Sequence, residues 1–427
     1  MLPGRAKELL RGLFDAMVAA AAPEHLLPSR LPPPPRGRTL VLGAGKAAAA
    51  MAKTVEDHWS SPLSGLVVTR HGHAVFCERV AVVEAGHPFP DDVGEEAARR
   101  SLALARSLTS DDLALALFSG GGSALLTLPA PSLTLGHLQD VNRELLRSGV
   151  PIAEVNCVRK HLSAIAGGRL GAACAPAPVL TLLISDVPGD DPSAIASGPT
   201  VPDPSTFAEA RAVVEEYQLK LPPEVHHHLT EGRDETPKPG DPRLAGAQAI
   251  LLTTPARALE AAAAQARAAQ LEPRVLGAEI QGEARVLAAE HADLIRRVRL
   301  ARGDDTAETP AVILSGGETT VTVRGRGRGG RNTEYLLALA LALGAGETEG
   351  PRVFALAADT DGIDGTEENA GAFLLPDSLA RAAAAGIDAQ ALLEANDSYG
   401  FFKGLGDLLV TGPTRTNVND FRAVIVA

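Results

Sequence analysis

The sequence predicts an α/β protein with two domains. Its 427 residues exceed the usual domain size of about 100–200 residues. Short β-branched or leucine-rich runs alternate with helical patterns, as in parallel sheets that helices cover on both faces. The main change in composition is the segment 219–246, rich in proline and polar residues, which predicts a helical hairpin followed by a linker. We therefore expect domains at 1–240 and 241–427.

The expected elements follow in order along the chain. Residues 1–22 carry apolar side chains at helical spacing, interrupted by Glu8 and Asp15, which predicts an amphipathic helix and not a signal peptide. Strands are expected at 39–42, 66–69, 80–84, 113–118, 179–184, 249–253, 311–314, 353–357, 410–411 and 421–426, and helices at 47–59, 94–108, 208–217, 255–269, 281–299 and 332–343.

Composition narrows the range of partners. A formal net charge of −12 argues against a general nucleic-acid or anionic-membrane binder, which would present a basic face. The three cysteines lack CxxC spacing, which favours reduced thiols in the cytoplasm. No apolar stretch reaches the ~18 residues of a membrane span. The sequence is compatible with a homo-oligomer and does not specify one.

The first loop with chemical potential joins the strand at 39–42 to a helix. It matches the dinucleotide pattern G-x-G-x-x-A through Gly43, Gly45 and Ala48, and its backbone N–H groups can face an anion. The acidic residue that NAD binding needs about 20 positions later is replaced by Arg70, so an NADP-dependent reductase stays an alternative. Lys46 favours a phosphate instead, because a cation at a helix start opposes the helix dipole unless an anion lies there.

Two further loops follow apolar strands. The segment Ser119, Gly120, Gly121, Gly122 and Ser123 has three consecutive glycines, which favours close approach of the backbone to a phosphate or carboxylate. A plain tight turn is the alternative. After the strand at 179–184, Asp186 and Asp190 are expected to hold Mg²⁺ or to accept a hydroxyl proton, whereas Asp191 before Pro192 is expected to cap a turn.

The C-terminal half adds two more loops. Gly316, Gly317 and Glu318 follow the strand at 311–314, and a glycine-rich loop before the next helix carries Arg324, Arg326, Arg328 and Arg331. This concentration of arginine in an acidic protein predicts an anion site. The segment 357–365 resembles a calcium loop, but its ligand spacing fails. An acidic strand end near a metal-bound phosphate and a capped turn are equally compatible with that segment.

The ordered set of loops resembles the class II glycerate kinases, whose C-terminal part is called the MOFRL domain. The carriers are GAGKA at 43–47, SGGGSALL at 119–126, ISDVPGDDPSAIASGPT at 184–200, LSGGETTVTV at 314–323, GRGGRNTEYLLALA at 327–340 and AADTDGIDGTEENAGA at 357–372. The resemblance implies transfer of the γ-phosphoryl group of ATP, with Mg²⁺, to the 2-hydroxyl of D-glycerate. It also implies a Rossmann-like N-terminal domain, a smaller α/β C-terminal domain and catalysis in the cleft between them.

The resemblance maps an essential lysine and arginine onto Lys46 and Arg331. We expect both cations to stabilise charge on the transferring phosphoryl group. The loops at 43–45, 119–123 and 316–318 would hold nucleotide phosphates or the substrate carboxylate, and Asp186 and Asp190 would serve as base and metal ligand in an order that the sequence leaves open. Two alternatives are an NAD(P)H-dependent hydroxypyruvate reductase and a nucleotide sensor without turnover.

Overall fold

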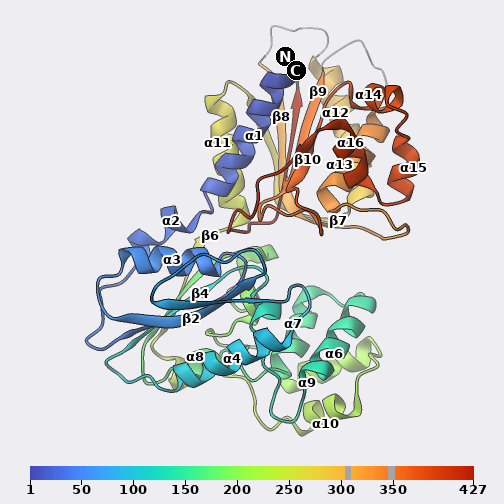
Figure 1. The fold of residues 1–427 in the computed structure, drawn as a ribbon. Coiled ribbons are helices and arrows are strands. Elements are labelled where there is room, and N and C mark those ends of the chain that lie inside the picture. Colours follow the sequence, from blue (N-terminus) through green and yellow to red (C-terminus); the bar gives the residue numbers. More distant parts are fainter. Residues whose placement is uncertain (303–308, 345–351) are drawn as a thin grey trace. The chain divides into compact units, whose positions relative to one another are not determined.

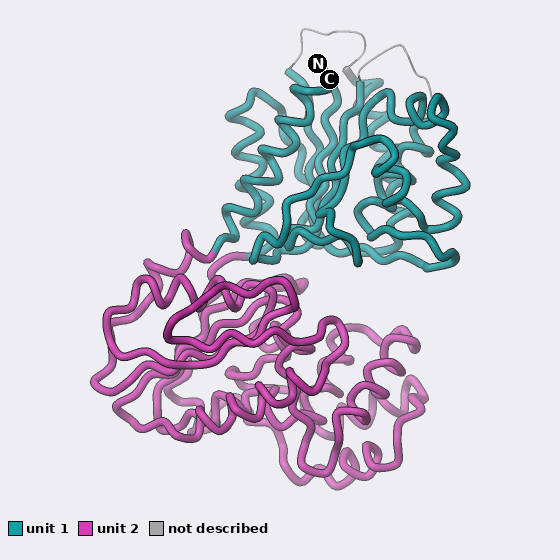
Figure 2. Tube along the Cα trace, in the orientation of Figure 1, with its two compact units in different colours: residues 1–22, 254–427 teal, residues 23–253 magenta. Residues whose placement is uncertain are grey.

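The computed structural model describes residues 1–302, 309–344 and 352–427, which form two compact units (Figures 1 and 2). We call residues 23–253 (magenta in Figure 2, unit 2 of its key) the first unit, and residues 1–22 together with 254–427 (teal in Figure 2, unit 1 of its key) the second unit. The sequence prediction divided the chain between 240 and 241. The division differs because α1 (Pro3–Ala19) packs with the elements after residue 253, and because β6 (Ala247–Thr253) extends the first sheet.

The unit 23–253 is built on a six-stranded parallel sheet. Its order, β3-β2-β1-β4-β5-β6, is that of a doubly wound nucleotide-binding fold. The strands are β1 (Thr39–Ala44), β2 (Leu63–Arg70), β3 (Val80–Ala85), β4 (Leu113–Phe118), β5 (Val179–Ile184) and β6. The Rossmann-like parallel sheet predicted for the first half of the chain is therefore confirmed.

Helices cover both faces of this sheet (Figure 1). Helix α3 (Ala48–His58) lies on one face, and α4 (Asp92–Ala105) with α8 (Arg169–Ala173) lies on the other. On the second face, alternate residues of β1 such as Leu40 and Leu42 are buried against Ala98 and Leu102 of α4. Because both faces are buried, the strands read as nearly continuous apolar runs, which is why they were predictable.

A separate helical cluster belongs to the same unit. Helices α6 (Leu135–Arg147), α7 (Ile152–His161), α9 (Phe207–Glu216) and α10 (Pro223–Glu231) enclose their own apolar core. The sequence pattern predicted α9 and a helical hairpin at α10, whereas no helix was expected at α6 or α7. Short helices complete the unit: α2 (Pro23–Leu26), α5 (Gly122–Leu125), and the 3₁₀ turns Pro28–Arg30, Pro188–Asp190, Ile195–Ser197 and Pro242–Leu244.

The second unit has a mixed sheet in the order β11-β10-β9-β12-β8-β7. Only β7 and β8 pair in parallel, so the expectation of a parallel sheet here is wrong. The strands are β7 (Glu272–Glu283), β8 (Ala311–Thr320), β9 (Val353–Asp359), β10 (Gly371–Leu374), β11 (Leu408–Leu409) and β12 (Asp420–Val426). The strand expected at 410–411 lies instead at Leu408–Leu409, and β7 and β10 were not predicted.

Helices also cover both faces of the second sheet. Helices α1 and α11 (Pro255–Ala268) lie on one face, where the rings of Phe14 and Phe421 are 6.1 Å apart. The other face carries α12 (Ala284–Arg302) and α13 (Arg331–Leu343), with α14 (Ser378–Ala384), α15 (Ala389–Glu394) and α16 (Ser398–Leu405) packed around them. The predicted smaller α/β unit is confirmed.

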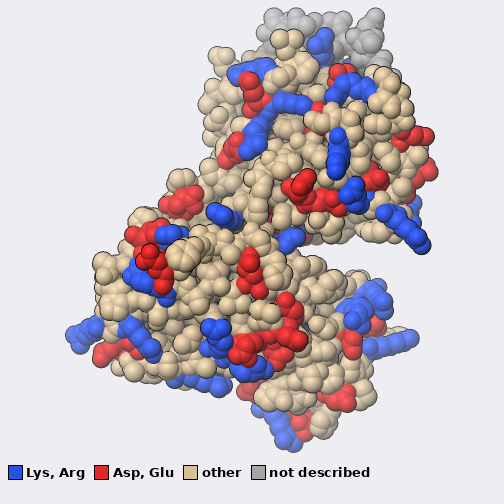
Figure 3. Space-filling model, viewed as in Figure 1, with Lys and Arg blue, Asp and Glu red and all other residues tan. Residues whose placement is uncertain are grey.

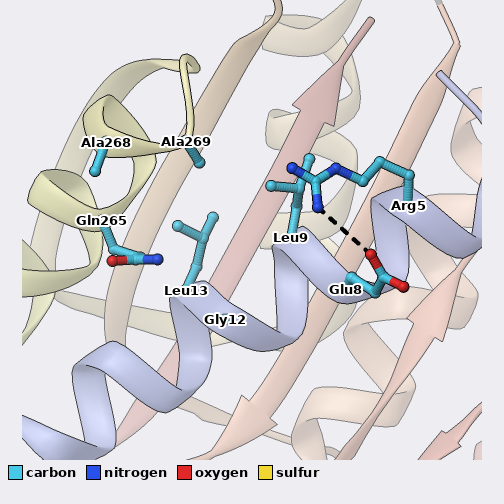
Figure 4. A pocket seen from close by; sticks show the side chains of 8 residues that line it. All are labelled: Arg5, Glu8, Leu9, Gly12, Leu13, Gln265, Ala268 and Ala269. Atoms are coloured by element: carbon cyan, nitrogen blue, oxygen red, sulfur yellow. Dashed lines mark hydrogen bonds and ion pairs between the residues drawn. The ribbon is translucent and has the colours of Figure 1, made fainter.

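Two surface features have little connection with the predicted site. A groove of about 310 Å³ lies between α1 and α11, and none of its lining residues is a predicted site residue (Figure 4). Basic and acidic side chains are interspersed on the face shown in Figure 3. Within the described residues, no helix is both long enough and apolar enough to cross a membrane.

Candidate active site

Lys46 lies in the turn between β1 and α3, two residues before the helix begins. It is only 8% exposed. A buried ammonium group is costly unless it has an anionic or hydrogen-bonding partner. A lysine at this position is therefore chemically suited to hold a phosphate at the carboxyl end of a parallel sheet, where α/β proteins place their ligands.

The backbone N–H groups of this turn already donate to acceptors within the protein. The N–H of Gly45 donates to the carbonyl of Val68 at 3.1 Å, and that of Lys46 to the carbonyl of Gly120 at 2.9 Å. The N–H of Ala47 donates to Ser119 Oγ at 3.0 Å. The sequence pattern suggested that these groups face an anion. The three N–H groups are used within the protein, so the positive charge of this turn comes from the Lys46 side chain.

The glycines of this turn permit close packing of backbone on backbone. A Cβ atom at Gly43 would lie 2.2 Å from the carbonyl oxygen of Leu117, and one at Gly45 would lie 2.2 Å from Ser119 Oγ. Gly45 also has φ of +133°, where L side chains are strained. Both glycines thus bring the turn against the end of β4 and its loop, which joins the first two predicted loops into one structure.

The three-glycine loop provides a second set of donors at this place. Gly121 has φ of +82° and precedes α5. Within the described chain, the N–H groups of Gly120 and Gly121 have no protein acceptor. A Cβ atom at Gly121 would lie 3.0 Å from the ring of His87 and 3.6 Å from Cγ of Lys46. The loop, Lys46 and His87 therefore gather at one point, and His87 is a site residue that the sequence analysis did not propose.

The third predicted loop contacts the second one. Ser123 Oγ and Ser197 Oγ are 2.9 Å apart, and a Cβ atom at Gly122 would lie 2.6 Å from the side chain of Ala196. Ala196 and Ser197 both have positive φ, at 52° and 59°. Strain of this kind at non-glycine residues persists only where the surroundings enforce it, and it clusters at functional sites.

Asp186 and Asp190 follow β5 in the same loop. Asp190 ends the turn Pro188–Asp190 with φ of 53°, and its Oδ1 atom is buried without a hydrogen-bond partner. An orphaned carboxylate oxygen suits a hard cation such as Mg²⁺, which binds one or two carboxylates together with substrate phosphates. The described residues contain no group of three or more His, Cys, Asp or Glu arranged for a metal ion. Asp191 accepts from the N–H of Ser193 at 2.8 Å, which confirms its capping role.

Arg331 lies at the first position of α13, in the other unit, among carboxylates. Its Nε donates to Asp420 at 2.8 Å, its Nη1 to Glu318 at 2.8 Å and its Nη2 to Asp359 at 3.0 Å. Burial alone would lower the pKa of Arg331, but the three carboxylates outweigh burial and raise that pKa well above its ordinary value. The guanidinium group is therefore held in one orientation and stays charged.

The segment before Arg331 differs from its predicted form. Gly316, Gly317 and Glu318 lie inside β8, where the two glycines pair with β12 and Glu318 pairs with β7, so the expected loop after 314 is wrong. A Cβ atom at Gly317 would lie 2.1 Å from the carbonyl oxygen of Ile280, so this glycine admits the irregular pairing with β7. A binding role for these three residues stays a prediction. Their position in a strand explains in another way why glycine is present at 316 and 317.

The arginine-rich loop packs closely on another loop. Cβ atoms at Gly325 and Gly327 would lie 2.1 Å and 2.5 Å from atoms of Ala395 and Asp397. Arg324, Arg326 and Arg328 are exposed, and Arg328 lies over the ring of Tyr399 at 5.0 Å. Of the four arginines, only Arg331 is partly enclosed and oriented by several partners.

Comparison with known proteins shows the family of this chain. Residues 9–230 match the family described as a domain of unknown function, DUF4147, and residues 311–420 match the MOFRL family. A glycerate 2-kinase of Pyrococcus horikoshii is 36% identical over 92% of this chain and 88% of its own. The crystal structure of a glycerate kinase from Thermotoga maritima superposes with a TM-score of 0.85 at 34% identity and covers 100% of both chains. A protein of Agrobacterium vitis, provisionally named a hydroxypyruvate reductase, is 51% identical over 99% of this chain and 94% of its own.

The fold and the relatives together define an α/β phosphotransferase of two units. The chain belongs to the class II glycerate kinase family, with a DUF4147 region followed by a MOFRL domain.

Several residues that organise the site have no signal in the sequence. Asp420 at the start of β12 and the buried pair of Lys160 and Asp203, 3.1 Å apart, were not predicted. Lys160 and Asp203 lie against Gly167, whose N–H donates to the carbonyl of Ser197 and so supports the strained third loop. An isolated aspartate or lysine carries no pattern until its partner is known. His87 had a weak signal, because it follows β3 in the sequence His87-Pro88.

Proposed function

We propose that this protein transfers the γ-phosphoryl group of ATP to the 2-hydroxyl of D-glycerate, giving 2-phosphoglycerate and ADP. The observation that carries the proposal is the buried side chain of Lys46, which lies beside the three-glycine loop at the carboxyl end of a doubly wound sheet. Phosphoryl transfer depends on positioning and on cations at the transferring group more than on covalent chemistry. The kinase names of the relatives from P. horikoshii and T. maritima point the same way.

The three-glycine loop suits an anionic group of either substrate. The N–H groups of Gly120 and Gly121 have no acceptor in the described chain, and consecutive backbone donors of this kind bind phosphates and carboxylates. Ser119 is less available, because its hydroxyl already accepts from Ala47. We assign the loop to the nucleotide phosphates or to the glycerate carboxylate, with Lys46 next to the transferring group.

Asp186 and Asp190 are the proposed metal ligands and base. Bound Mg²⁺ would neutralise charge on the phosphates and lower the barrier to attack. Asp190 offers the orphaned Oδ1 atom for the cation. The other carboxylate would accept the proton of the 2-hydroxyl group as its oxygen attacks phosphorus. Arg331 is the second proposed cation for the transferring group. Its three hydrogen bonds leave two of its five N–H donors for a phosphoryl oxygen.

A reductase is the second candidate, because relatives at 51% and 49% identity carry a hydroxypyruvate reductase name. In a dinucleotide-binding loop, the backbone donors of the first turn approach the pyrophosphate. Here the N–H groups of Gly45, Lys46 and Ala47 are used within the protein. This favours the kinase.

The decisive experiment couples product formation to enolase, which consumes 2-phosphoglycerate and not 3-phosphoglycerate. We expect ADP release that requires both D-glycerate and Mg²⁺, together with phosphoenolpyruvate formation in the coupled reaction. In parallel, NADPH and NADH are supplied with hydroxypyruvate in the absence of ATP. Nucleotide oxidation there, without phosphoryl transfer to glycerate, would replace the proposal by the reductase.

A further inference from the structure

Asp420 connects Arg331 to the core of the second unit. Its Oδ1 atom accepts from Arg331 Nε at 2.8 Å and from Asn332 Nδ2 at 2.8 Å. Its Oδ2 atom accepts from Arg422 Nη2 at 2.6 Å and from the N–H of Thr319 at 3.4 Å. Asp420 is fully buried on β12, a central strand of the sheet. The carboxylate is therefore fixed on both oxygens and cannot rotate away from Arg331 without losing several charge-assisted hydrogen bonds.

Arg422 is the anchor on the far side of this carboxylate. It is 1% exposed and lies over the ring of Tyr335 at 5.5 Å. Its Nη2 also donates to Thr319 Oγ1 at 3.0 Å, whereas its Nε and Nη1 atoms are buried without a partner. A buried guanidinium group with unsatisfied donors is expensive. This cost is understandable if the group has a role beyond stability, and the carboxylate to which Arg422 donates, that of Asp420, also holds Arg331.

The three carboxylates around Arg331 are not equivalent. Glu318 is 55% exposed, so its contact with Arg331 is screened by solvent and easily exchanged. Asp359 is 6% exposed and Asp420 is 0% exposed. Asp420 contacts Nε, the atom nearest the side-chain stem, and so sets the direction of the guanidinium plane while both Nη atoms keep a second N–H.

A cavity lies beside this arrangement. It measures about 290 Å³ and is lined by Arg331, Thr319, Gly329, Gly330 and neighbouring residues. Arg331 is thus the cationic residue that connects Asp420 to a space large enough for a phosphate-sized group.

We propose that Asp420, held in place by Arg422, is a positioning residue that orients Arg331 for phosphoryl transfer. The proposal rests on the proposed function of Arg331 as a cation that acts on the transferring group. Misplacement of such a group by about 1 Å can cost on the order of 10²-fold in rate. Loss of Asp420 should therefore appear in kcat, because an interaction made in the transition state is lost there and not in substrate binding.

The test compares Asp420→Ala with a matched control, Asp407→Ala. Asp407 is also a buried aspartate of the same unit, 2% exposed, with two cationic partners, Lys7 and Arg381, but it has no hydrogen bond to Arg331. With D-glycerate, ATP and Mg²⁺, Asp420→Ala should lower kcat about 10- to 100-fold with both KM values within about twofold. Asp407→Ala should lower thermal stability comparably and leave kcat within about twofold.

Arg331→Ala and the double variant Arg331→Ala/Asp420→Ala complete a cycle. If Asp420 acts through Arg331, its removal should cost little further activity once Arg331 is absent. Independent, multiplicative losses would overturn the proposal, and so would full kcat in Asp420→Ala when Arg331→Ala is inactive. An Arg331→Ala variant with normal kcat would instead refute the proposed catalytic role of Arg331, and the positioning role of Asp420 would fail with it.

Asp420→Ala leaves the Arg422 guanidinium buried without its carboxylate, so this variant can fail to fold. In that case Asp420→Ala/Arg422→Met removes both partners and leaves no uncompensated buried charge. Arg422→Met alone, which retains the bond from Arg331 to Asp420, should lose less kcat than the double variant. Equal kcat in wild type and in a folded double variant would overturn the proposal.

Discussion

The carboxylate of Asp364 accepts two hydrogen bonds from Thr333, one from its backbone N–H at 2.9 Å and one from its hydroxyl at 2.8 Å. The N–H of Asn332 donates to the same carboxylate at 3.0 Å. The protein thus supplies its own anion at the start of α13. Burial raises the pKa of Asp364, although these hydrogen bonds oppose that change. A phosphate could not use this helix end without displacing Asp364, so the anion site predicted in this unit would depend on the arginine side chains.

Replacement of Lys46 by alanine should lower kcat about 10²- to 10³-fold with little change in KM, since removal of one charge-stabilising donor typically costs that much. Lys53→Ala is the matched control, because Lys53 lies on α3 just after the same turn and pairs with Asp57 on the surface. Steady-state kinetics with D-glycerate and ATP measure both variants. A Lys46→Ala enzyme with wild-type kcat would refute the proposed role.

Substitution of Asp190 by asparagine should raise the Mg²⁺ concentration needed for half-maximal activity by roughly tenfold, because the orphaned Oδ1 atom loses its charge. Asp186→Asn tests the other carboxylate of the loop. Asp191→Asn is the control, since Asp191 caps the same loop through Ser193. Activity is titrated against Mg²⁺ at saturating substrates. An unchanged Mg²⁺ requirement in both Asp186→Asn and Asp190→Asn would place the metal elsewhere.

Gly45→Ala should destabilise the first unit by roughly 2–4 kcal/mol, because the new methyl group meets backbone and side chain together in a strained conformation. Its Cβ would lie 2.2 Å from Ser119 Oγ and 2.5 Å from the carbonyl oxygen of Ser119. Gly72→Ala separates the two causes, since Gly72 has φ of +81° but no atom within 4 Å of the new Cβ. That control should lose about 1 kcal/mol. Equal urea midpoints for the two variants would contradict the close packing of the two loops.

The stability of the second unit should fall as pH drops below about 6.5. Burial and then the charge of Arg422 lower the pKa of His291 to about 4. Between these two pH values His291 is protonated in the unfolded chain but not in the folded chain. Its contribution to the free energy of unfolding is therefore fully present above the unfolded pKa and is lost on acidification, by up to roughly 3 kcal/mol.

The measurement compares urea unfolding at pH 7 and pH 5. His291→Gln should remove this part of the pH dependence, although loss of the 2.8 Å contact between His291 Nδ1 and the Tyr335 hydroxyl lowers stability at both pH values. His227→Gln, at a 72% exposed position, should behave like wild type. A His291→Gln variant with the full wild-type slope would contradict the assignment.

The sequence was sufficient for the inner strands β4 and β5 of the parallel sheet. Both were predicted at their observed bounds, because each is a six-residue, mostly apolar run that ends at a turn. β7 was not predicted, since most of its residues are exposed or half-buried and its register with β8 shifts twice. The mixed order of the second sheet was not predicted either, because an apolar run does not show whether its strand is parallel or antiparallel to its neighbours.

The site was predictable in its parts and not in its assembly. Lys46, the three glycines and Asp190 stand out through residue type and position after a strand. Ser119 accepts a hydrogen bond from the N–H of Ala47 because β1 and β4 are neighbours in the sheet, and no local sequence pattern shows that pairing. The contact of Arg331 with Asp420 joins residues 89 positions apart. Such contacts are fixed by sheet order and register, which are tertiary properties.

The place of α1 has a consequence for the order of assembly during synthesis. Helix α1 leaves the ribosome before the entire unit 23–253, yet its partners are α11, β9 and β12, which follow much later. Its apolar face, including Phe14, must stay uncovered until Phe421 has been made. Because β12 lies between β9 and β8, a stop codon before Asp420 would remove an inner strand together with the carboxylate that holds Arg331. A chain that ends before β12 is therefore expected to lose both the order of this sheet and the orientation of Arg331.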